Sequence, residues 1–220
     1  AFDFVGKNTD NGYSVWASNV IYNETMKKYV MYFCTTSSYV KSTLCFATAD
    51  NIEGPYTYVD TILYSGYGKS NISETNLYDV LGKNADISRY LEYGGYNNKE
   101  WPNCIDPAIF TDADGRMWMN YGSWSGGIFL LEIDPTTGYP IYPVDDKDAD
   151  PYYGYRLIGG GHHSAEGPYI QYDAENGYYY LFVSYGDLQS DGGYQIRQFR
   201  SEKPTGPYAV SYTHLTLPTI

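Results

Sequence analysis

The sequence predicts an all-β protein built from repeated antiparallel sheets, in the manner of a β-propeller. Short apolar blocks such as Tyr29–Phe33 and Tyr178–Val183 are bounded by Gly, Asn, Asp or Pro, and helical periodicity is almost absent. The chain is also rich in residues that favour pleated strands and tight turns, with 28 Tyr, 23 Gly and 11 Pro. In addition, one plan of strands recurs three times along the chain.

The recurring plan is a short first strand, a hairpin, an aromatic strand, and then one or two further strands. The first segment with this plan begins at Trp16–Tyr22 and continues through Lys28–Tyr32. It ends with Ala47–Asp50 and Gly54–Tyr56. This alternation of apolar blocks and turn residues is typical of strands joined by hairpins.

The second and third segments repeat the plan with clear turn signals. The second begins at Ile105–Phe110 and turns at Asp114–Gly115, and the third begins at Glu166–Ile170 and turns at Asn176–Gly177. Repeats of three or four strands at spacings of roughly 60 to 90 residues indicate propeller blades with long insertions. An ordinary β-sandwich is the competing architecture.

Two stretches interrupt the plan. Residues 66–100 are polar and rich in Gly and Asn, and we expect a long loop there, with a short helix around Tyr78–Tyr93. The acidic run Asp145–Pro151 is expected to be a solvated surface loop, because it shows no ordered spacing of calcium ligands.

The last residues do not fit the repeats. Ser211–Ile220 has no acidic residue or glycine, and it resembles the translated adapter sequence that is often appended to metagenomic reading frames. We therefore predict one domain over residues 1–208 and a non-native tail over residues 209–220, and we set His214 aside with the tail.

Composition excludes several classes of partner. The formal net charge is −12 and the pI is about 4.5. This charge argues against nucleic acid or an anionic membrane as a ligand, since both are negatively charged and are bound mainly through Lys and Arg. No apolar run approaches the roughly 18 residues of a membrane helix. Three cysteines are too few for a disulfide scaffold. Buried thiols are the simplest interpretation of them, and a Cys34–Cys45 bridge is the alternative.

Two acidic residues occupy the same place in two repeats. Asp106 precedes Pro107 at the start of the second segment, and Glu166 precedes Gly167-Pro168 at the start of the third. The first strand of each propeller blade lines the central axis, so both carboxyl groups are expected to point into one shared cleft. Paired carboxylates in a cleft are the tools of glycoside hydrolysis, because one protonates the leaving oxygen while another activates water.

These motifs resemble glycoside hydrolase family 43, and within it the endo-1,5-α-L-arabinanases. The resemblance rests on Ile105–Phe110 with Tyr121–Ile128, and on Glu166–Ile170 with Tyr179–Gly186. Trp16–Val20 is also similar to the family's Trp-Ala-Pro-Asp-Val segment, although Ser18 and Asn19 depart from its Pro and Asp. The resemblance covers most of residues 14–208, and the motifs are specific only in combination.

The resemblance implies a five-bladed propeller, of which about three blades are present here, and an inverting mechanism with three acids. Glu166 would be the general acid, and Asp106 would orient it and raise its pKa. The general base of the family lies in a first-blade His-Asp-Pro motif that has no counterpart in this sequence, where Asp3 and Asp10 lack that context. We therefore expect residues 1–220 to be inactive by themselves, with the first blade and the C-terminal part of the propeller missing.

Other residues are candidates for contacts to the substrate. Trp16 and Asn19 belong to the first motif, and Ser123, Trp124 and Ser125 follow an aromatic strand. Aromatic faces suit stacking against sugar rings.

His163, next to His162, lies shortly before Glu166 and is expected to bond to substrate or acid. The resemblance also implies a calcium ion on the propeller axis, for which no ligand can be assigned in this sequence.

The expected function is hydrolysis of α-1,5-L-arabinofuranosidic linkages in arabinan or a related plant polysaccharide, outside the cell. An exo-acting α-L-arabinofuranosidase or β-xylosidase of the same family is the nearest alternative. A non-catalytic carbohydrate-binding propeller is the alternative from another class. Asp106 and Glu166 together argue against it, because a binding protein has no need for both.

Overall fold

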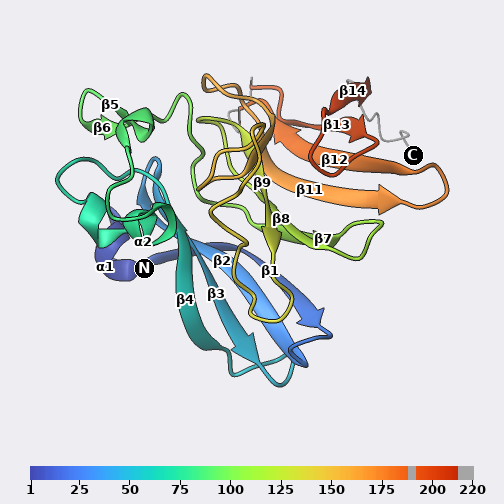
Figure 1. Ribbon diagram of the computed structural model, residues 1–220, viewed down its shortest axis with the longest axis horizontal. Helices are drawn as coiled ribbons and strands as arrows, with labels where there is room; N and C mark the ends of the chain where they lie inside the picture. Colours follow the sequence, from blue (N-terminus) through green and yellow to red (C-terminus); the bar gives the residue numbers. More distant parts are fainter. Residues whose placement is uncertain (188–191, 213–220) are drawn as a thin grey trace.

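The computed structural model describes residues 1–187 and 192–212 and is dominated by three four-stranded antiparallel sheets. Within each sheet, strands that are neighbours in sequence are neighbours in space (Figure 1). The all-β prediction is confirmed, while the closed five-bladed ring stays a prediction.

The three sheets follow one another along the chain. The first sheet contains β1 (Ser14–Asn23), β2 (Lys28–Ser38), β3 (Lys41–Ala49) and β4 (Thr57–Tyr64). The second contains β7 (Ala108–Thr111), β8 (Met117–Tyr121), β9 (Ile128–Ile133) and β10 (Tyr155–Ile158). The third contains β11 (Glu166–Asp173), β12 (Tyr178–Tyr185), β13 (Gln195–Ser201) and β14 (Ala209–Tyr212).

The expected hairpins are present where the turn residues predicted them. Asp114–Gly115 lies between β7 and β8, and Asn176–Gly177 lies between β11 and β12. Gly115 and Gly177 have φ values of 82° and 72°, a conformation that a residue without a Cβ adopts without strain. The sequence-coded turns therefore set the start of the second and third sheets.

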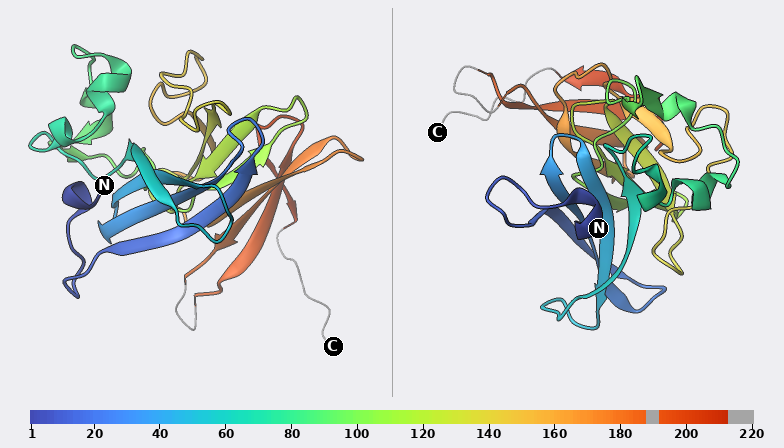
Figure 2. Two further views of the ribbon diagram at one scale, coloured as in Figure 1. Left: turned by 90° about the horizontal axis from the view of Figure 1, so that it is seen from below. Right: turned by 90° about the vertical axis from the view of Figure 1, so that its left-hand side faces the viewer.

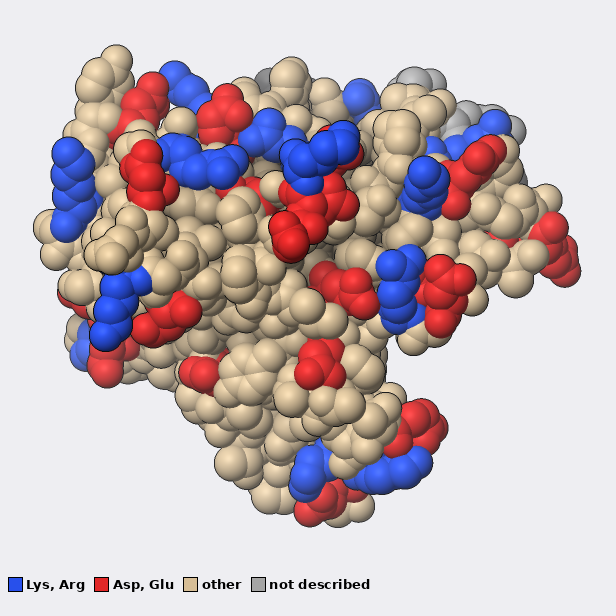
Figure 3. Space-filling model, viewed as in Figure 1, with Lys and Arg blue, Asp and Glu red and all other residues tan. Residues whose placement is uncertain are grey.

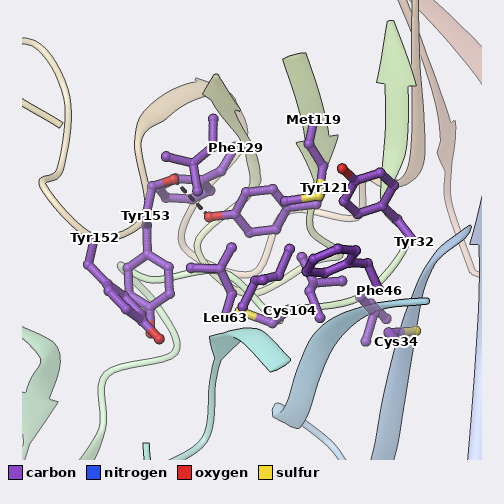
Figure 4. Packing of buried hydrophobic residues seen from close by; sticks show 14 of the residues in the cluster. Tyr32, Cys34, Phe46, Leu63, Cys104, Met119, Tyr121, Phe129, Tyr152 and Tyr153 are labelled. Carbon is purple, nitrogen blue, oxygen red and sulfur yellow. Dashed lines mark hydrogen bonds between the residues drawn. The ribbon is translucent and has the colours of Figure 1, made fainter. Parts of the chain in front are cut away.

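The middle sheet is buried on both faces, which makes it the centre of the molecule. All five residues of β8 are buried. Met119 and Tyr121 pack with Tyr32 and Phe46 of the first sheet (Figure 4), whereas Trp118 packs in a second cluster with residues of β11 and β12. Successive strand residues point to opposite faces, so one short strand serves two cores.

The first strands of the three sheets lie side by side. β7 contacts both β1 and β11 (Figure 1). This arrangement is the one expected of propeller blades around an axis. It brings the starts of β7 and β11 together, and these are the places where the sequence puts Asp106 and Glu166.

The stretch 66–100 is not a plain loop. It contains η1 (Ile72–Glu74), α2 (Leu77–Leu81), η2 (Ser88–Tyr90), β5 (Leu91–Glu92) and β6 (Gly95–Tyr96). These elements lie on the opposite side of the molecule from β13 and β14 (Figure 2). A further short helix, α1 (Phe2–Val5), packs near β2 and β3. Within the described residues, no helix is both long and apolar enough to span a membrane.

Asp150 departs from the expected solvated acidic loop, because it is only 6% exposed. Its carboxylate accepts hydrogen bonds from the Tyr90 hydroxyl at 3.1 Å and from the backbone N–H groups of Tyr152 and Tyr153 at 2.9 and 2.8 Å. Arg89 forms an ion pair with it at 3.3 Å. A buried charge needs such partners, and here they fasten the 66–100 insertion to the second sheet.

All three cysteines are free and buried, so the buried-thiol interpretation is confirmed.

Near the C-terminal end of the described residues, β14 (Ala209–Tyr212) pairs with β13, and this strand lies inside the predicted tail. Residues 213–220, including His214, lie outside the described residues. The boundary at residue 208 stays a prediction.

Candidate active site

The structure brings the two predicted carboxylates together. Asp106 lies two residues before the start of β7, and Glu166 is the first residue of β11. The backbone N–H of Gly167 donates a hydrogen bond to Oδ2 of Asp106 at 3.1 Å. The residue after one acid thus anchors the other acid.

The backbone at these strand starts is unusual in all three sheets. Ala17, Asp106 and Gly167 have φ values of 48°, 56° and 57°, in the left-handed region that most side chains avoid. The pairing register also shifts between Trp16 and Asn19 in β1. It shifts again at the start of β11, after its first residue. Such bulges re-aim side chains, and they are common next to active sites.

Two hydroxyl groups hold the carboxylate of Glu166. The Tyr194 hydroxyl donates to Oε1 at 2.8 Å, and the Ser123 hydroxyl donates to Oε2 at 3.1 Å. Burial raises the pKa of the Tyr194 hydroxyl, and the neighbouring Glu166 carboxylate raises it further, so the hydroxyl keeps its proton and remains a donor. Ser123 was predicted as a site residue. Tyr194 was not, because nothing in the sequence distinguishes it from the other tyrosines.

The pKa of the Asp106 carboxyl group is raised. Burial raises its pKa from 3.8 to about 6; the Gly167 hydrogen bond opposes this shift, and the Glu166 charge adds to it. Enzymes that use acid–base chemistry at moderate pH commonly have two carboxyl groups whose different environments separate their pKa values.

Glu166 lies on the walls of two cavities. The Trp16 cavity has a volume of about 560 Å³, and its walls include Asp10, Trp16, Tyr39, Asn103, Ser123, Trp124 and Glu166. The Asn19 cavity has a volume of about 460 Å³, and its walls include Ser18, Asn19, Asp106, Glu166, Gly167 and Tyr194. Both cavities therefore offer space for a ligand beside Glu166.

Several predicted contact residues line these cavities. Trp16, which is 54% exposed, and the half-buried Trp124 both lie on the Trp16 cavity. Asn19 lies on the Asn19 cavity, where its Oδ1 accepts a hydrogen bond from the Ile109 backbone N–H at 3.1 Å and so ties β1 to β7. The amide nitrogen of the same side chain carries two further N–H donors.

The other two predicted residues lie off both cavities. Ser125 is fully buried, and its Oγ contacts the Tyr39 hydroxyl at 3.1 Å. His163 is exposed, and its Nδ1 lies 2.6 Å from the Gly160 carbonyl oxygen. The Nδ1 of the neighbouring His162 lies 3.0 Å from the hydroxyl of Tyr39, a residue on the wall of the Trp16 cavity.

The described part of the chain contains no cluster of typical metal-binding side chains. Among these residues, no three His, Cys, Asp or Glu side chains gather closely enough to hold a metal ion. The calcium ion expected from the resemblance stays a prediction, and Asp112 is engaged in a hairpin. Its carboxylate accepts from the side chains of Arg116 and Trp118 at 2.9 and 2.8 Å.

Comparison with known proteins identifies the family. The model for "Glycosyl hydrolases family 43" matches residues 83–219. The chain belongs to glycosyl hydrolase family 43. The resemblance stated from the sequence motifs is thereby confirmed.

Two curated members of family 43 are similar over most of this chain. An extracellular endo-α-(1→5)-L-arabinanase of Thermotoga petrophila is 41% identical over 194 residues, which are 88% of this chain and 36% of that protein. Extracellular endo-α-(1→5)-L-arabinanase 2 of Bacillus subtilis is 40% identical over 195 residues, which are 89% of this chain and 36% of that protein. The chain thus spans about a third of the length of these relatives.

Solved structures of the family share the fold. The crystal structure of the endo-1,5-α-L-arabinanase from Thermotoga petrophila has a TM-score of 0.68 and covers 88% of this chain and 38% of that one. The family 43 protein YxiA from Bacillus licheniformis is 37% identical, with a TM-score of 0.72, and covers 94% of this chain and 40% of that one.

Proposed function

We propose that this chain is part of an enzyme that hydrolyses α-1,5-L-arabinofuranosidic linkages in arabinan. The observation that carries the proposal is the position of Glu166, which is held by Ser123 and Tyr194 beside Asp106 on the wall shared by two cavities. Membership of family 43 supports glycosidase chemistry. The two relatives from Thermotoga petrophila and Bacillus subtilis, both endo-α-(1→5)-L-arabinanases, support the linkage.

In this proposal Glu166 is the general acid. Its proton passes to the glycosidic oxygen as the bond to the anomeric carbon breaks, and water adds to that carbon from the opposite face with inversion. The Tyr194 and Ser123 hydroxyls stabilise the carboxylate that the proton leaves behind. Asp106 orients Glu166 through the Gly167 backbone. The base that accepts the proton of water is not assigned, and no step uses a metal ion.

Space on both sides of Glu166 supports cleavage within a polymer. An endo-acting enzyme must hold sugar residues on each side of the bond that it cuts, and the Trp16 and Asn19 cavities flank the acid in this way. The exposed face of Trp16 offers an apolar platform for a furanose ring.

The surface supports an uncharged ligand. On the face in Figure 3, Lys and Arg side chains are interleaved with Asp and Glu instead of forming a field of one sign. We place the enzyme outside the cell, as the names of both relatives state for those proteins. The complete domain is proposed to be a five-bladed propeller, because three sheets with adjacent first strands fit consecutive blades.

Sugar release from linear arabinan and from arabinoxylan tests the proposal. The complete gene product is compared with its Glu166→Gln variant, which keeps the shape of the side chain and one acceptor oxygen but removes the acid. Short arabino-oligosaccharides from linear arabinan, lost by at least 100-fold in the variant, are expected. Release of monosaccharide alone would move the assignment to an exo-acting arabinofuranosidase or xylosidase. Binding of arabinan without any release would favour the carbohydrate-binding alternative.

A further inference from the structure

The hydroxyl group of Tyr39 joins three parts of the chain. Tyr39 lies in the turn between β2 and β3 of the first sheet. Its hydroxyl oxygen is 3.1 Å from Oγ of Ser125 and 3.0 Å from Nδ1 of His162. These partners are 86 and 123 residues away in sequence, and both lie in loops of the second sheet and its connection to the third. No contact of the proposed catalytic step accounts for this junction.

Both loops that meet at Tyr39 support Glu166. The loop of Ser125 also contains Ser123, whose hydroxyl bonds to the Glu166 carboxylate. The loop of His162 leads directly to Ala165, whose carbonyl oxygen accepts the Trp124 N–H at 2.8 Å. The two loops are further joined by a hydrogen bond from the His162 N–H to the Ser125 carbonyl oxygen at 2.9 Å. The position of Glu166 therefore depends on how these loops are held.

The backbone around the junction adopts conformations that need support. Trp124, Ser125 and His162 have φ values of 47°, 38° and 63°. Non-glycine residues in the left-handed region persist where surrounding contacts over-determine them, and such residues cluster at functional sites. The Tyr39 hydroxyl contacts the side chains of two of these three residues, Ser125 and His162.

A phenol suits this junction in either charge state of the histidine. With neutral His162, the Tyr39 O–H donates to Nδ1 and accepts from the Ser125 hydroxyl. With protonated His162, the Nδ1–H donates to the Tyr39 oxygen and the Tyr39 O–H donates to Ser125. The hydrogen bonds from Tyr39 to His162 and to Ser125 are therefore present in both cases. The junction holds the two loops together without depending on the charge of the histidine.

We propose that Tyr39 is a positioning residue which, through His162 and Ser125, clamps the two loops that hold Glu166 in place. The functional part of this inference rests on the proposed role of Glu166 as the general acid. The Tyr39 ring also lies on the wall of the Trp16 cavity, so the hydroxyl must be tested separately from the ring.

Three variants and a control separate the clamp from simple substrate contact. Tyr39→Phe keeps the ring and removes the hydroxyl, and His162→Ala removes its partner. His162→Asn keeps an acceptor near the place of Nδ1 and suits the left-handed backbone. Tyr169→Phe is the control, because Tyr169 is exposed and its hydroxyl makes, among the described residues, only a long contact of 3.4 Å to Oε1 of the nearby Gln171.

In the complete gene product, Tyr39→Phe and His162→Ala are each expected to lower kcat on linear arabinan about tenfold, with KM changed less than threefold. The double variant should lose about tenfold and not about 100-fold, because each single change already breaks the hydrogen bond between Tyr39 and His162. His162→Asn should stay within threefold of the unmodified protein. Unchanged kcat, losses that multiply, or a rise in KM alone would overturn the clamp.

Hydrogen exchange tests the clamp without a substrate. Amides of residues 159–165 are expected to exchange at least tenfold faster in Tyr39→Phe and to be unaffected in Tyr169→Phe, with unchanged global melting in both. Equal exchange in both variants would contradict the proposal. Hydrogen exchange does not depend on enzyme activity. It therefore tests the clamp even if the unmodified protein does not cut arabinan and the proposed function is wrong.

Discussion

Replacing Asp106 by Asn should stabilise the fold while it damages the enzyme. Asp106 is partly buried, and its pKa is raised from 3.8 to about 6 mainly by that burial. A carboxyl group with a raised pKa stabilises the fold while it is protonated, and this stabilisation is lost as the pH rises from about 4 through 6. Asn has the shape of the protonated acid, carries no charge, and can still accept from the Gly167 N–H.

The size of the gain follows from the shift. A difference of about two pKa units corresponds to about 3 kcal/mol between the ionised and neutral forms. The same linkage makes the advantage of Asp106→Asn up to about 3 kcal/mol at pH 7.5 but only about 1 kcal/mol at pH 4.5. For a domain of this size, 3 kcal/mol raises Tm by about 6 to 12 °C.

Urea unfolding of Asp106→Asn and the unmodified protein at both pH values measures this. Asp10→Asn is the matched control, because that carboxyl group is exposed, and its replacement should change stability by less than about 0.5 kcal/mol. Equal or lower stability of Asp106→Asn at pH 7.5, or the same gain at both pH values, would refute the reasoning. Meanwhile kcat should fall at least about 100-fold, so the carboxylate is retained for function at the expense of stability.

The remaining predictions concern the acid, a hairpin and the thiols. Tyr194→Phe should lower kcat on arabinan about tenfold, because a charge-assisted hydrogen bond to Glu166 is lost, and unchanged kinetics would contradict that contact. Asp112→Asn should destabilise the protein by about 2 kcal/mol at pH 7. Burial alone would raise the Asp112 pKa, but the Trp118 and Arg116 contacts lower it, so this difference should shrink as unfolding is measured below about pH 4. Residues 1–220 expressed alone should release no sugar from arabinan, whereas measurable release would show that they contain a general base. The three cysteines should react with a thiol reagent only after unfolding, since all are buried and burial raises the pKa of Cys34 to about 12; rapid reaction of the native protein would disprove this.

Local pattern was sufficient for the elements and for the two acids. Strand alternation and the turns at Asp114–Gly115 and Asn176–Gly177 act within a few residues, so they can be recognised without knowing the fold. Asp106 and Glu166 were found because each stands at the start of a repeat, and equivalent positions of repeated sheets become neighbours in space. Trp16 was predicted as a substrate contact from its family motif, and Trp124 from its place after an aromatic strand.

Tertiary structure alone decided the partners of these residues. The bonds from Tyr194 to Glu166 and from Tyr39 to His162 join loops whose course no local pattern encodes. The contact of His162, and not of His163, with the Tyr39 hydroxyl likewise depends on the course of these loops, in which His162 has a left-handed backbone. Asp150 was expected in solvent, but the distant Arg89 and Tyr90 compensate its burial. Sequence therefore determined the strands and the two carboxylates proposed to react, whereas long-range contacts between loops determined which side chains hold those carboxylates in place.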